Sequence, residues 1–216
     1  MLKDFLKNYP FGSLTDRQTN AVHFIISKIE VSTIQCQKHQ VYVLATIYLE
    51  TGQTYEPVIE GFYLGGNRVR KLFNYYKEHN PKAIKTIFPE GPNGVNYLGR
   101  GLVQITHLYN YETFSKLLRV DLVHNPDLAS DPEIAWQITE FGMMRGLFTG
   151  KKLLDYLNEE ESNWYDARKI INGHDRAIEI KEYAEKIYHS ISGIEPGDIP
   201  KPRGIEKPPK STTTSG

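Results

Sequence analysis

VYVLATIYLETGQTYEPVIE, residues 41–60, is the stretch that decides the fold. It begins with an apolar run from Val41 to Leu49 that is interrupted only by Thr46. Such a run belongs in the interior of a protein, either as a fully buried helix or as a central strand. Glu50 follows the run directly and precedes a Thr-Gly pair that can end a helix. The pattern therefore places an ionisable residue at the edge of a core.

Two glutamates of this stretch, Glu50 and Glu60, are candidate catalytic residues. If the run is helical, Glu50 lies at the C-terminal end, where the helix dipole disfavours a second negative charge. Partial burial also favours the protonated form, which a general acid requires. A turn over residues 51–57 returns the chain to Glu60, so both carboxylates could face one cleft at the roughly 6.5–9.5 Å of an inverting glycosidase. The alternative is a helix-end surface residue and an ordinary loop charge.

Length and composition restrict the class of protein. The 216 residues suit one domain, or one domain with a tail, and can bury a sizeable core. The 26 Lys and Arg balance 26 Asp and Glu, so no overall basic field indicates a nucleic-acid partner. Cys36 is the only cysteine and the seven histidines show no metal-ligand spacing. We therefore expect no intramolecular disulfide and no cysteine metal site.

The N-terminal residues predict where the protein is made. Residues 1–13 lack the continuous apolar region of a Sec signal, and no apolar stretch reaches the ~18 residues of a membrane span. We expect a monomer that is synthesised in the cytoplasm without a Sec signal and has no membrane span. A target outside the membrane would require release of the protein or delivery by another system.

Helical periodicity recurs along the chain on both sides of the core run. Residues 14–30 form an amphipathic pattern that Thr15 or Ser13 can cap. Residues 68–79 (RVRKLFNYYKEH) predict a short basic helix within a polar, aromatic insertion over 61–96. This helix is either a solvated surface element or one wall of a groove. In the second case, aromatic rings would offer stacking faces to a sugar: Tyr63, Tyr75 and Tyr76.

The segment 97–111, YLGRGLVQITHLYNY, predicts a second part of a site. Its Gly-Arg-Gly sequence allows a tight turn or a close approach to a ligand. A short strand leading into a helix fits the residues that follow. Apolar and polar residues then alternate, so that Gln104, Thr106 and Asn110 lie together opposite the apolar side chains. Amide and hydroxyl groups on one face match the donors and acceptors of sugar hydroxyls.

The remaining C-terminal half predicts helices and a tail. Residues 111–119 predict a helix with Phe114, Leu117 and Leu118 inward. Ser130 and Glu133 form a capping-box pattern for a helix that reaches Gly150. Residues 164–173 predict a helix that ends at an Asn-Gly pair, and residues 175–191 predict the last helix. Residues 193–216 hold five prolines and no aromatic residue, so we expect a disordered tail or linker after a catalytic domain over 1–192.

Four blocks of sequence together resemble glycoside hydrolase family 19, a chitinase-like family that includes bacterial and phage endolysins. The blocks occur in the family's order and are ATIYLETG at 45–52, PVIEGF at 57–62, NYLGRGLVQITHLYNY at 96–111, and ARKIINGHDR at 167–176. The resemblance extends over roughly residues 14–188. It implies a mainly α, lysozyme-like fold with two lobes, a central substrate cleft and at most a small β element.

The resemblance also implies roles for individual residues. Glu50 matches the general acid, although Leu49 stands where the family usually has His. Glu60 matches the general base that activates water, and Thr106 matches the residue that helps to hold this water. Further positions match the family's substrate-contacting residues or its Tyr-x-Gly-Arg-Gly turn: Tyr97, Arg100, Gln104, Asn110 and Asn172. Asp175 and Arg176 match a pair for which we expect a structural or charge-network role.

The implied function is hydrolysis of β-1,4 linkages in bacterial peptidoglycan, by an endolysin or a delivered antibacterial protein. The implied mechanism is an inverting displacement by Glu50 and Glu60, in which no metal or organic cofactor has a role. Three alternatives stay open at this point: a chitinase acting on chitin oligomers, a lysozyme-like lytic transglycosylase that needs only one catalytic glutamate, and a glycan-binding or phage-structural protein without activity.

Overall fold

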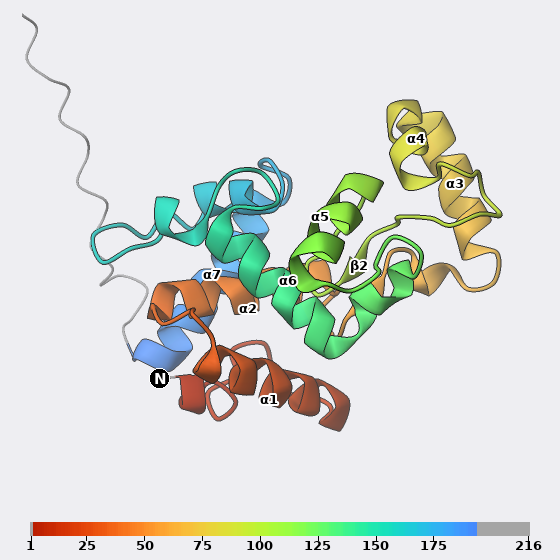
Figure 1. Cartoon of the computed structure of the whole chain (residues 1–216). Coiled ribbons are helices and arrows are strands. Elements are labelled where there is room, and N and C mark those ends of the chain that lie inside the picture. The colour runs from red at the N-terminus through yellow and green to blue at the C-terminus, as the bar shows by residue number, and fades with distance from the viewer. Residues whose placement is uncertain (1, 194–216) are drawn as a thin grey trace, which may run out of the picture.

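A computed structural model describes residues 2–193 of the chain (Figure 1). The predicted tail therefore lies outside the described residues, apart from Gly193. The described part is mainly helical, as predicted, with one small sheet. The elements are α1 (Asp16–Val31), α2 (Gln37–Glu50), β1 (Val58–Ile59), α3 (Arg68–His79), α4 (Ile84–Ile87), β2 (Arg100–Gly101), α5 (Leu108–Leu118), α6 (Pro132–Arg145) and α7 (Ala177–Ser192), with short 3₁₀ helices between them.

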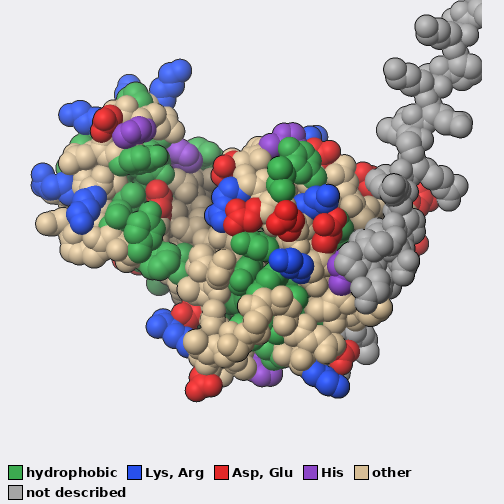
Figure 2. Space-filling view, turned by 180° about the vertical axis from the view of Figure 1, so that it is seen from behind, with side chains coloured by type: hydrophobic (Ala, Val, Ile, Leu, Met, Phe, Trp, Pro, Cys, Tyr) green, Lys and Arg blue, Asp and Glu red, His purple; other side chains and the backbone are tan. Residues whose placement is uncertain are grey.

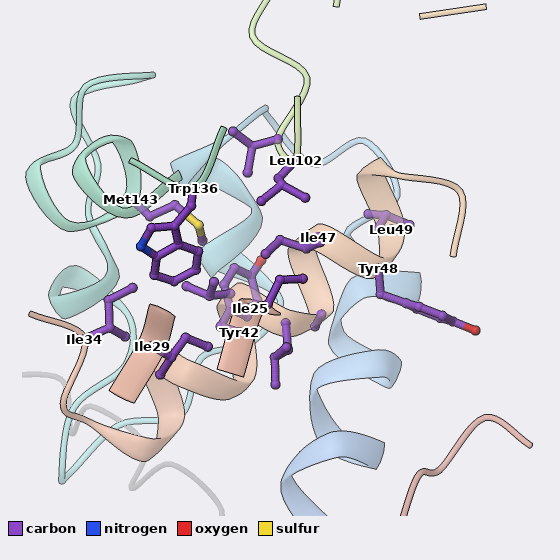
Figure 3. Close-up of a cluster of buried hydrophobic side chains, with 14 of the residues drawn as sticks. Ile25, Ile29, Ile34, Tyr42, Ile47, Tyr48, Leu49, Leu102, Trp136 and Met143 are labelled. Atoms are coloured by element: carbon purple, nitrogen blue, oxygen red, sulfur yellow. The ribbon is translucent and has the colours of Figure 1, made fainter. Parts of the chain in front are cut away.

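The run Val41–Leu49 forms most of α2, so the choice between a buried helix and a strand is settled as a helix. Every side chain of this run is buried. The helix packs along α7, and its other sides meet α1 and α6 (Figure 3). Burying a large apolar side chain stabilises a fold by about 1.5–3 kcal/mol, so a helix that is apolar on all sides specifies the centre of the large lobe.

Helix caps fix where the first and sixth helices begin. Thr15 caps α1 as predicted, and its side chain forms a capping box with Gln18. The predicted cap of α6 at Ser130 is wrong, because the carboxylate of Asp131 accepts the backbone N–H groups of Glu133 and Ile134. Pro132 explains the shift. A proline suits the first helical position, which makes the residue immediately before it the cap.

Three other predictions for the C-terminal half need correction. Helix α6, which begins at Pro132, ends at Arg145 and does not reach Gly150, because Gly146 adopts a left-handed conformation with φ 70°. Residues 164–173 contain a 3₁₀ helix, Asp166–Ile170, instead of an α-helix. The helix predicted over 111–119 begins at Leu108, and Leu117 is 37% exposed.

A second, smaller lobe is built from the insertion between residues 61 and 98. Its apolar residues form a cluster separate from the main core: Leu72, Ala83, Ile87, Phe88 and Leu98. Helices α3 and α4 of this lobe project away from α1, α2 and α7 (Figure 1). The fold is therefore the two-lobed, lysozyme-like helical architecture that the resemblance implied.

The two-stranded sheet joins the lobes. Val58 of β1 pairs with Gly101 of β2, and Ile59 pairs with Arg100, in antiparallel register. The pairing continues one step further, because the backbone N–H of Glu60 donates to the carbonyl of Gly99 at 2.7 Å. The sheet therefore fixes Glu60 against the turn that carries the polar residues of segment 97–111.

Candidate active site

A polar cleft of about 810 Å³ lies where the two lobes meet. From behind, the small lobe is on the left of the molecule and a recess separates it from the larger body (Figure 2). Both lobes contribute to the lining. Of the predicted site residues, the cleft brings together Glu50, Glu60, Gln104, Thr106, Asn110 and Asn172.

Glu50 is the last residue of α2, and its side chain is 16% exposed. Its Oε1 accepts a hydrogen bond from Nη1 of Arg168 at 2.5 Å. The guanidinium of Arg168 is 3% exposed and is also held through Nε, which donates to the carbonyl of Asp175 at 2.8 Å. Sequence reasoning expected only influences that favour a neutral Glu50, and it missed this cationic partner.

Glu60 is held from two directions. Its Oε1 accepts the hydroxyl of Tyr76 at 2.8 Å, and its Oε2 accepts the backbone N–H of Gly99 at 3.0 Å. Tyr76 stays a neutral donor, because burial and the neighbouring carboxylate of Glu60 raise its pKa well above the usual value. A carboxylate oxygen can accept two hydrogen bonds, so each oxygen keeps a lone pair for water.

The turn after Gly99 aligns the polar residues of the cleft floor. The side-chain amide of Gln104 donates to the carbonyls of Val58 and Gly101, which ties the turn to β1. The Thr106 hydroxyl donates to the carbonyl of Gln104, and the amide of Asn110 donates to the carbonyl of Thr106. All three side chains are partly exposed, so they can also meet a ligand.

Two residues of this turn have strained backbones. Gln104 has φ 55° and His107 has φ 72°, values that side-chain-bearing residues rarely adopt. Strain of this kind costs on the order of 1–3 kcal/mol per residue and is concentrated at functional sites.

Nδ1 of His107 lies 2.8 Å from the hydroxyl of Thr86. Burial lowers the pKa of His107, and the nearby carboxylate of Glu60 opposes this effect. His107 is thus a neutral cleft residue that sequence reasoning did not select.

Tyr97 and Arg100, which were predicted to contact substrate, are not among the described residues that line the cleft. Arg100 is 3% exposed, and its guanidinium bonds Asp127, Asn96, the Leu98 carbonyl and the Tyr111 hydroxyl. Tyr97 is buried and donates to the carbonyl of Val123. The geometry therefore gives both residues a role beneath the turn, where they fix its shape.

The opposite rim of the cleft comes from the C-terminal part of the chain. Asn172 is exposed there beside Arg176, whose guanidinium makes two hydrogen bonds with Glu179. The charge-network role expected for Arg176 agrees with this pair. Asp175 contributes its backbone carbonyl to Arg168, as described above.

Some, but not all, of the three tyrosines that were considered as a wall of the groove line the cleft. Tyr63 and Tyr76 line the cleft, in agreement with the groove-wall alternative, and Tyr63 is 77% exposed. Tyr75 does not line the cleft and stacks on His79.

Among residues 2–193, no cluster of His, Cys, Asp or Glu could hold a metal ion, and no helix there is long and apolar enough to span a membrane.

Two lobes of helices with a carboxylate from each side of a polar cleft define the class as a lysozyme-like fold. The family model for chitinase class I, glycoside hydrolase family 19, matches residues 33–146. This match covers more than half of the chain, so the chain belongs to that family. The matched region includes Glu50, Glu60 and the turn to Asn110, and it ends before Arg168.

Several named chitinases are similar to parts of the chain. Chitinase 11 of Oryza sativa subsp. japonica is 49% identical over 47 residues, or 21% of this chain and 18% of that protein. Endochitinase A2 of Pisum sativum is 39% identical over 66 residues, or 29% of this chain and 20% of that protein. The chain thus spans about a fifth of the length of these curated relatives.

Two solved chitinase structures align with most of this chain. Chitinase C from Streptomyces griseus HUT6037 aligns with 88% of this chain and 68% of its own, at 16% identity and a TM-score of 0.48. A bacterial family 19 chitinase aligns with 91% of this chain and 96% of its own, at 18% identity and a TM-score of 0.46.

Proposed function

We propose that this protein hydrolyses β-1,4 linkages of bacterial cell-wall peptidoglycan by an inverting mechanism. One observation carries the proposal. Glu50, from the end of α2 in the large lobe, and Glu60, from the end of β1 beside the small lobe, line the same cleft. An inverting glycosidase needs one carboxylic acid and one carboxylate on opposite sides of the bond that is cleaved.

Glu50 is the general acid in this proposal. Because Oε1 accepts the Arg168 guanidinium, Oε2 is the oxygen that can carry a proton towards the glycosidic oxygen. The described residues form no hydrogen bond with Oε2. Proton transfer to the leaving oxygen breaks the bond to the anomeric carbon, and the electron pair of that bond becomes a lone pair of the departing hydroxyl.

Glu60 is the general base. Tyr76 and Gly99 hold its two oxygens in place, so the carboxylate can take a proton from a water molecule that attacks the opposite face of the sugar. Thr106 supports this step, because it lines the cleft and its hydroxyl oxygen keeps lone pairs after donating to Gln104. The product then has the inverted anomeric configuration.

Chitin is a second candidate substrate, favoured by the names of the similar proteins. Chitin and peptidoglycan share a β-1,4-linked backbone of N-acetylated amino sugars, so the same pair of carboxylates would serve for both. A lytic transglycosylase would use Glu50 alone and would not need the two hydrogen bonds that orient Glu60.

The test is to digest purified peptidoglycan and chitin oligomers and to analyse the products by mass spectrometry. NMR follows the anomeric configuration of the newly formed reducing ends. We expect muropeptides with reducing ends and the α-anomer as the first product. Anhydro sugars would identify a transglycosylase and contradict the proposal. Cleavage of chitin with intact peptidoglycan would establish the second candidate, and no cleavage of either would leave a binding protein.

A further inference from the structure

The small lobe carries a charge that the rest of the chain does not share. Residues 61–96 contain two glutamates and six cationic side chains, a formal charge of +4. The remainder of the chain has 20 Lys and Arg against 24 Asp and Glu, a formal charge of −4. The cations are Arg68, Arg70, Lys71, Lys77, Lys82 and Lys85.

These cations have no acidic partners within the described part of the chain. Every ion pair among residues 2–193 lies outside 61–96. Arg70 donates to the side-chain oxygen of Asn93 and Lys71 to the carbonyl of Leu64, which are both neutral acceptors. Five of the six side chains are exposed, and Arg68 is half-buried.

Basic side chains surround the outer face of the small lobe in the space-filling view (Figure 2). The large lobe differs in that several of its cations are paired with carboxylates, among them Arg168, Lys169 and Arg176, whereas among the described residues none in the small lobe is. Like charges that stay close together without partners repel one another and destabilise a fold. An anionic ligand on the small lobe would relieve this repulsion.

The position of the lobe limits what that ligand is. Tyr76 of α3 and Asn80, the residue that follows this helix, line the cleft, and the same helix carries Arg70, Lys71 and Lys77. A glycan strand in the cleft therefore runs beside the basic surface. Chitin has no ionised groups to place there. Peptidoglycan carries a peptide on every second sugar, and each peptide has free carboxylates.

We infer that the small lobe binds the carboxylates of the stem peptides on the peptidoglycan strand that occupies the cleft. The inference rests on the proposed function and specifies its substrate as an anionic, peptide-bearing glycan. The basic helix α3 then has two roles. Its inner side chain Tyr76 lines the cleft together with the following Asn80, and its outer cations hold the substituents of the strand.

The experiment compares two triple variants with equal changes in net charge. The test variant is Lys77→Gln, Lys82→Gln and Lys85→Gln, in the small lobe. The control is Lys116→Gln, Lys151→Gln and Lys186→Gln, in the large lobe. All six lysines are exposed and none lines the cleft. Binding is measured by co-sedimentation on ice with peptidoglycan freed of other wall polymers, at about 0.05 M and about 0.5 M NaCl.

We expect the test variant to bind on the order of tenfold more weakly than wild type at low salt, because it loses three exposed cations that each contribute modestly to binding. The control should bind as wild type does, and high salt should remove the difference between them. Wild-type protein should also bind poorly to the same glycan after an amidase has removed its peptides. Equal losses in both triple variants, or undiminished binding to the peptide-free glycan, would overturn the inference.

Activity on a neutral chitin oligomer separates this inference from the proposed function. Any cleavage of that oligomer should proceed at the same rate in wild type and both triple variants, because none of the six lysines reaches the cleft. A wild-type protein that cleaves no glycan would contradict the proposed function, whereas the binding comparison would still decide the role of the small lobe. A slower test variant on the neutral oligomer would contradict the inference.

Discussion

Arg168 and Glu50 lie 118 positions apart in the chain, yet their side chains meet with Nη1 and Oε1 separated by 2.5 Å. The pair is nearly excluded from water, with exposed fractions of 3% for Arg168 and 16% for Glu50. Because Arg168 also donates to the carbonyl of Asp175, it connects the end of α2 to the loop before α7. The orientation of Glu50 therefore depends on a part of the chain outside the region that the family model matches.

Replacing Arg168 should affect both stability and activity. Arg168→Lys keeps the charge but cannot bond Glu50 and the Asp175 carbonyl in the same way, because lysine lacks the planar fork of donors. We expect a loss of about 1–3 kcal/mol in the free energy of unfolding and a lower kcat, with Arg168→Gln at least as severe. Urea unfolding and initial hydrolysis rates measure the two effects.

The neighbouring Lys169 provides the control. It forms an ion pair with Asp166, but both side chains are about a third exposed and solvent screens the interaction. Lys169→Gln should change stability little and leave activity near wild type. Equal losses in the Lys169 and Arg168 variants would show that the pair with Glu50 has no special role.

Glu50→Gln should reduce hydrolysis on the order of 10²–10⁴-fold, because an amide cannot donate a proton as an acid does. It should also lower the melting temperature, since the buried Arg168 guanidinium would then face a neutral amide in place of a carboxyl group that can ionise. Rates should therefore be compared well below the melting temperature, with circular dichroism as a check on folding. Wild-type rates in this variant would exclude Glu50 as the acid.

Glu60→Gln should abolish nearly all hydrolysis with little change in stability. Tyr76 and Gly99 donate to Glu60, and an amide oxygen can still accept one of these hydrogen bonds. The loss should be on the order of 10²–10⁴-fold, measured by the release of reducing ends. Near wild-type turnover with anhydro products would contradict the inverting assignment and support a transglycosylase.

The sequence predicted that residues 41–49 are buried, without deciding between helix and strand. It also predicted that Glu50, Glu60 and the 97–111 turn face one cleft, because local patterns and the family's sequence blocks indicate this. Apolar runs and alternation report directly on burial. The capping error at Ser130 was avoidable, since Pro132 marks Asp131 as the preceding cap residue. The 3₁₀ form of residues 166–170 was not predictable from periodicity over so short a segment.

The Arg168 pair could not be found by reasoning along the sequence. Nothing local to residue 168 indicates a carboxylate 118 positions earlier, and the contact exists only because the loop before α7 folds over the end of α2. Tyr97 and Arg100, in contrast, were selected from the sequence but do not line the cleft. Their block was correctly selected, but a motif does not tell which members face the ligand and which support the turn from below.

Substitutions of two glycines in the 97–111 turn should have different effects on activity and on stability. A methyl group on Gly99 would come within 2.9 Å of the Gln104 Oε1 and 3.3 Å of the Thr106 Oγ1. Both are side-chain atoms that can shift, so Gly99→Ala should lower kcat about tenfold or more by displacing cleft groups while it costs little stability. Steady-state kinetics and thermal unfolding of the same sample test this.

Gly101→Ala is the matched comparison. Gly101 has φ 89°, and its added methyl would come within 2.7 Å of the backbone carbonyl oxygen of Ala129, which cannot easily move. We expect this variant to lose more stability than Gly99→Ala, with a melting temperature lower by several degrees. The assignment of Gly99 to the cleft would fail if both variants lost stability and activity in equal proportion.

Acidification should destabilise the protein through His39 and His107 before its carboxylates titrate. Burial lowers the pKa of both histidines, against a weaker opposing effect from the Leu157 carbonyl at His39 and from Glu60 at His107. An unfolded histidine titrates near 6.5, so below about pH 6.5 the unfolded chain binds more protons than the folded one and the free energy of unfolding falls. Above that pH neither histidine contributes.

Urea midpoints from pH 7.5 to 5 measure the slope, and His39→Gln should flatten it, because an amide can still donate to Leu157 without titrating. A wild-type midpoint that stays constant across this range would contradict the prediction.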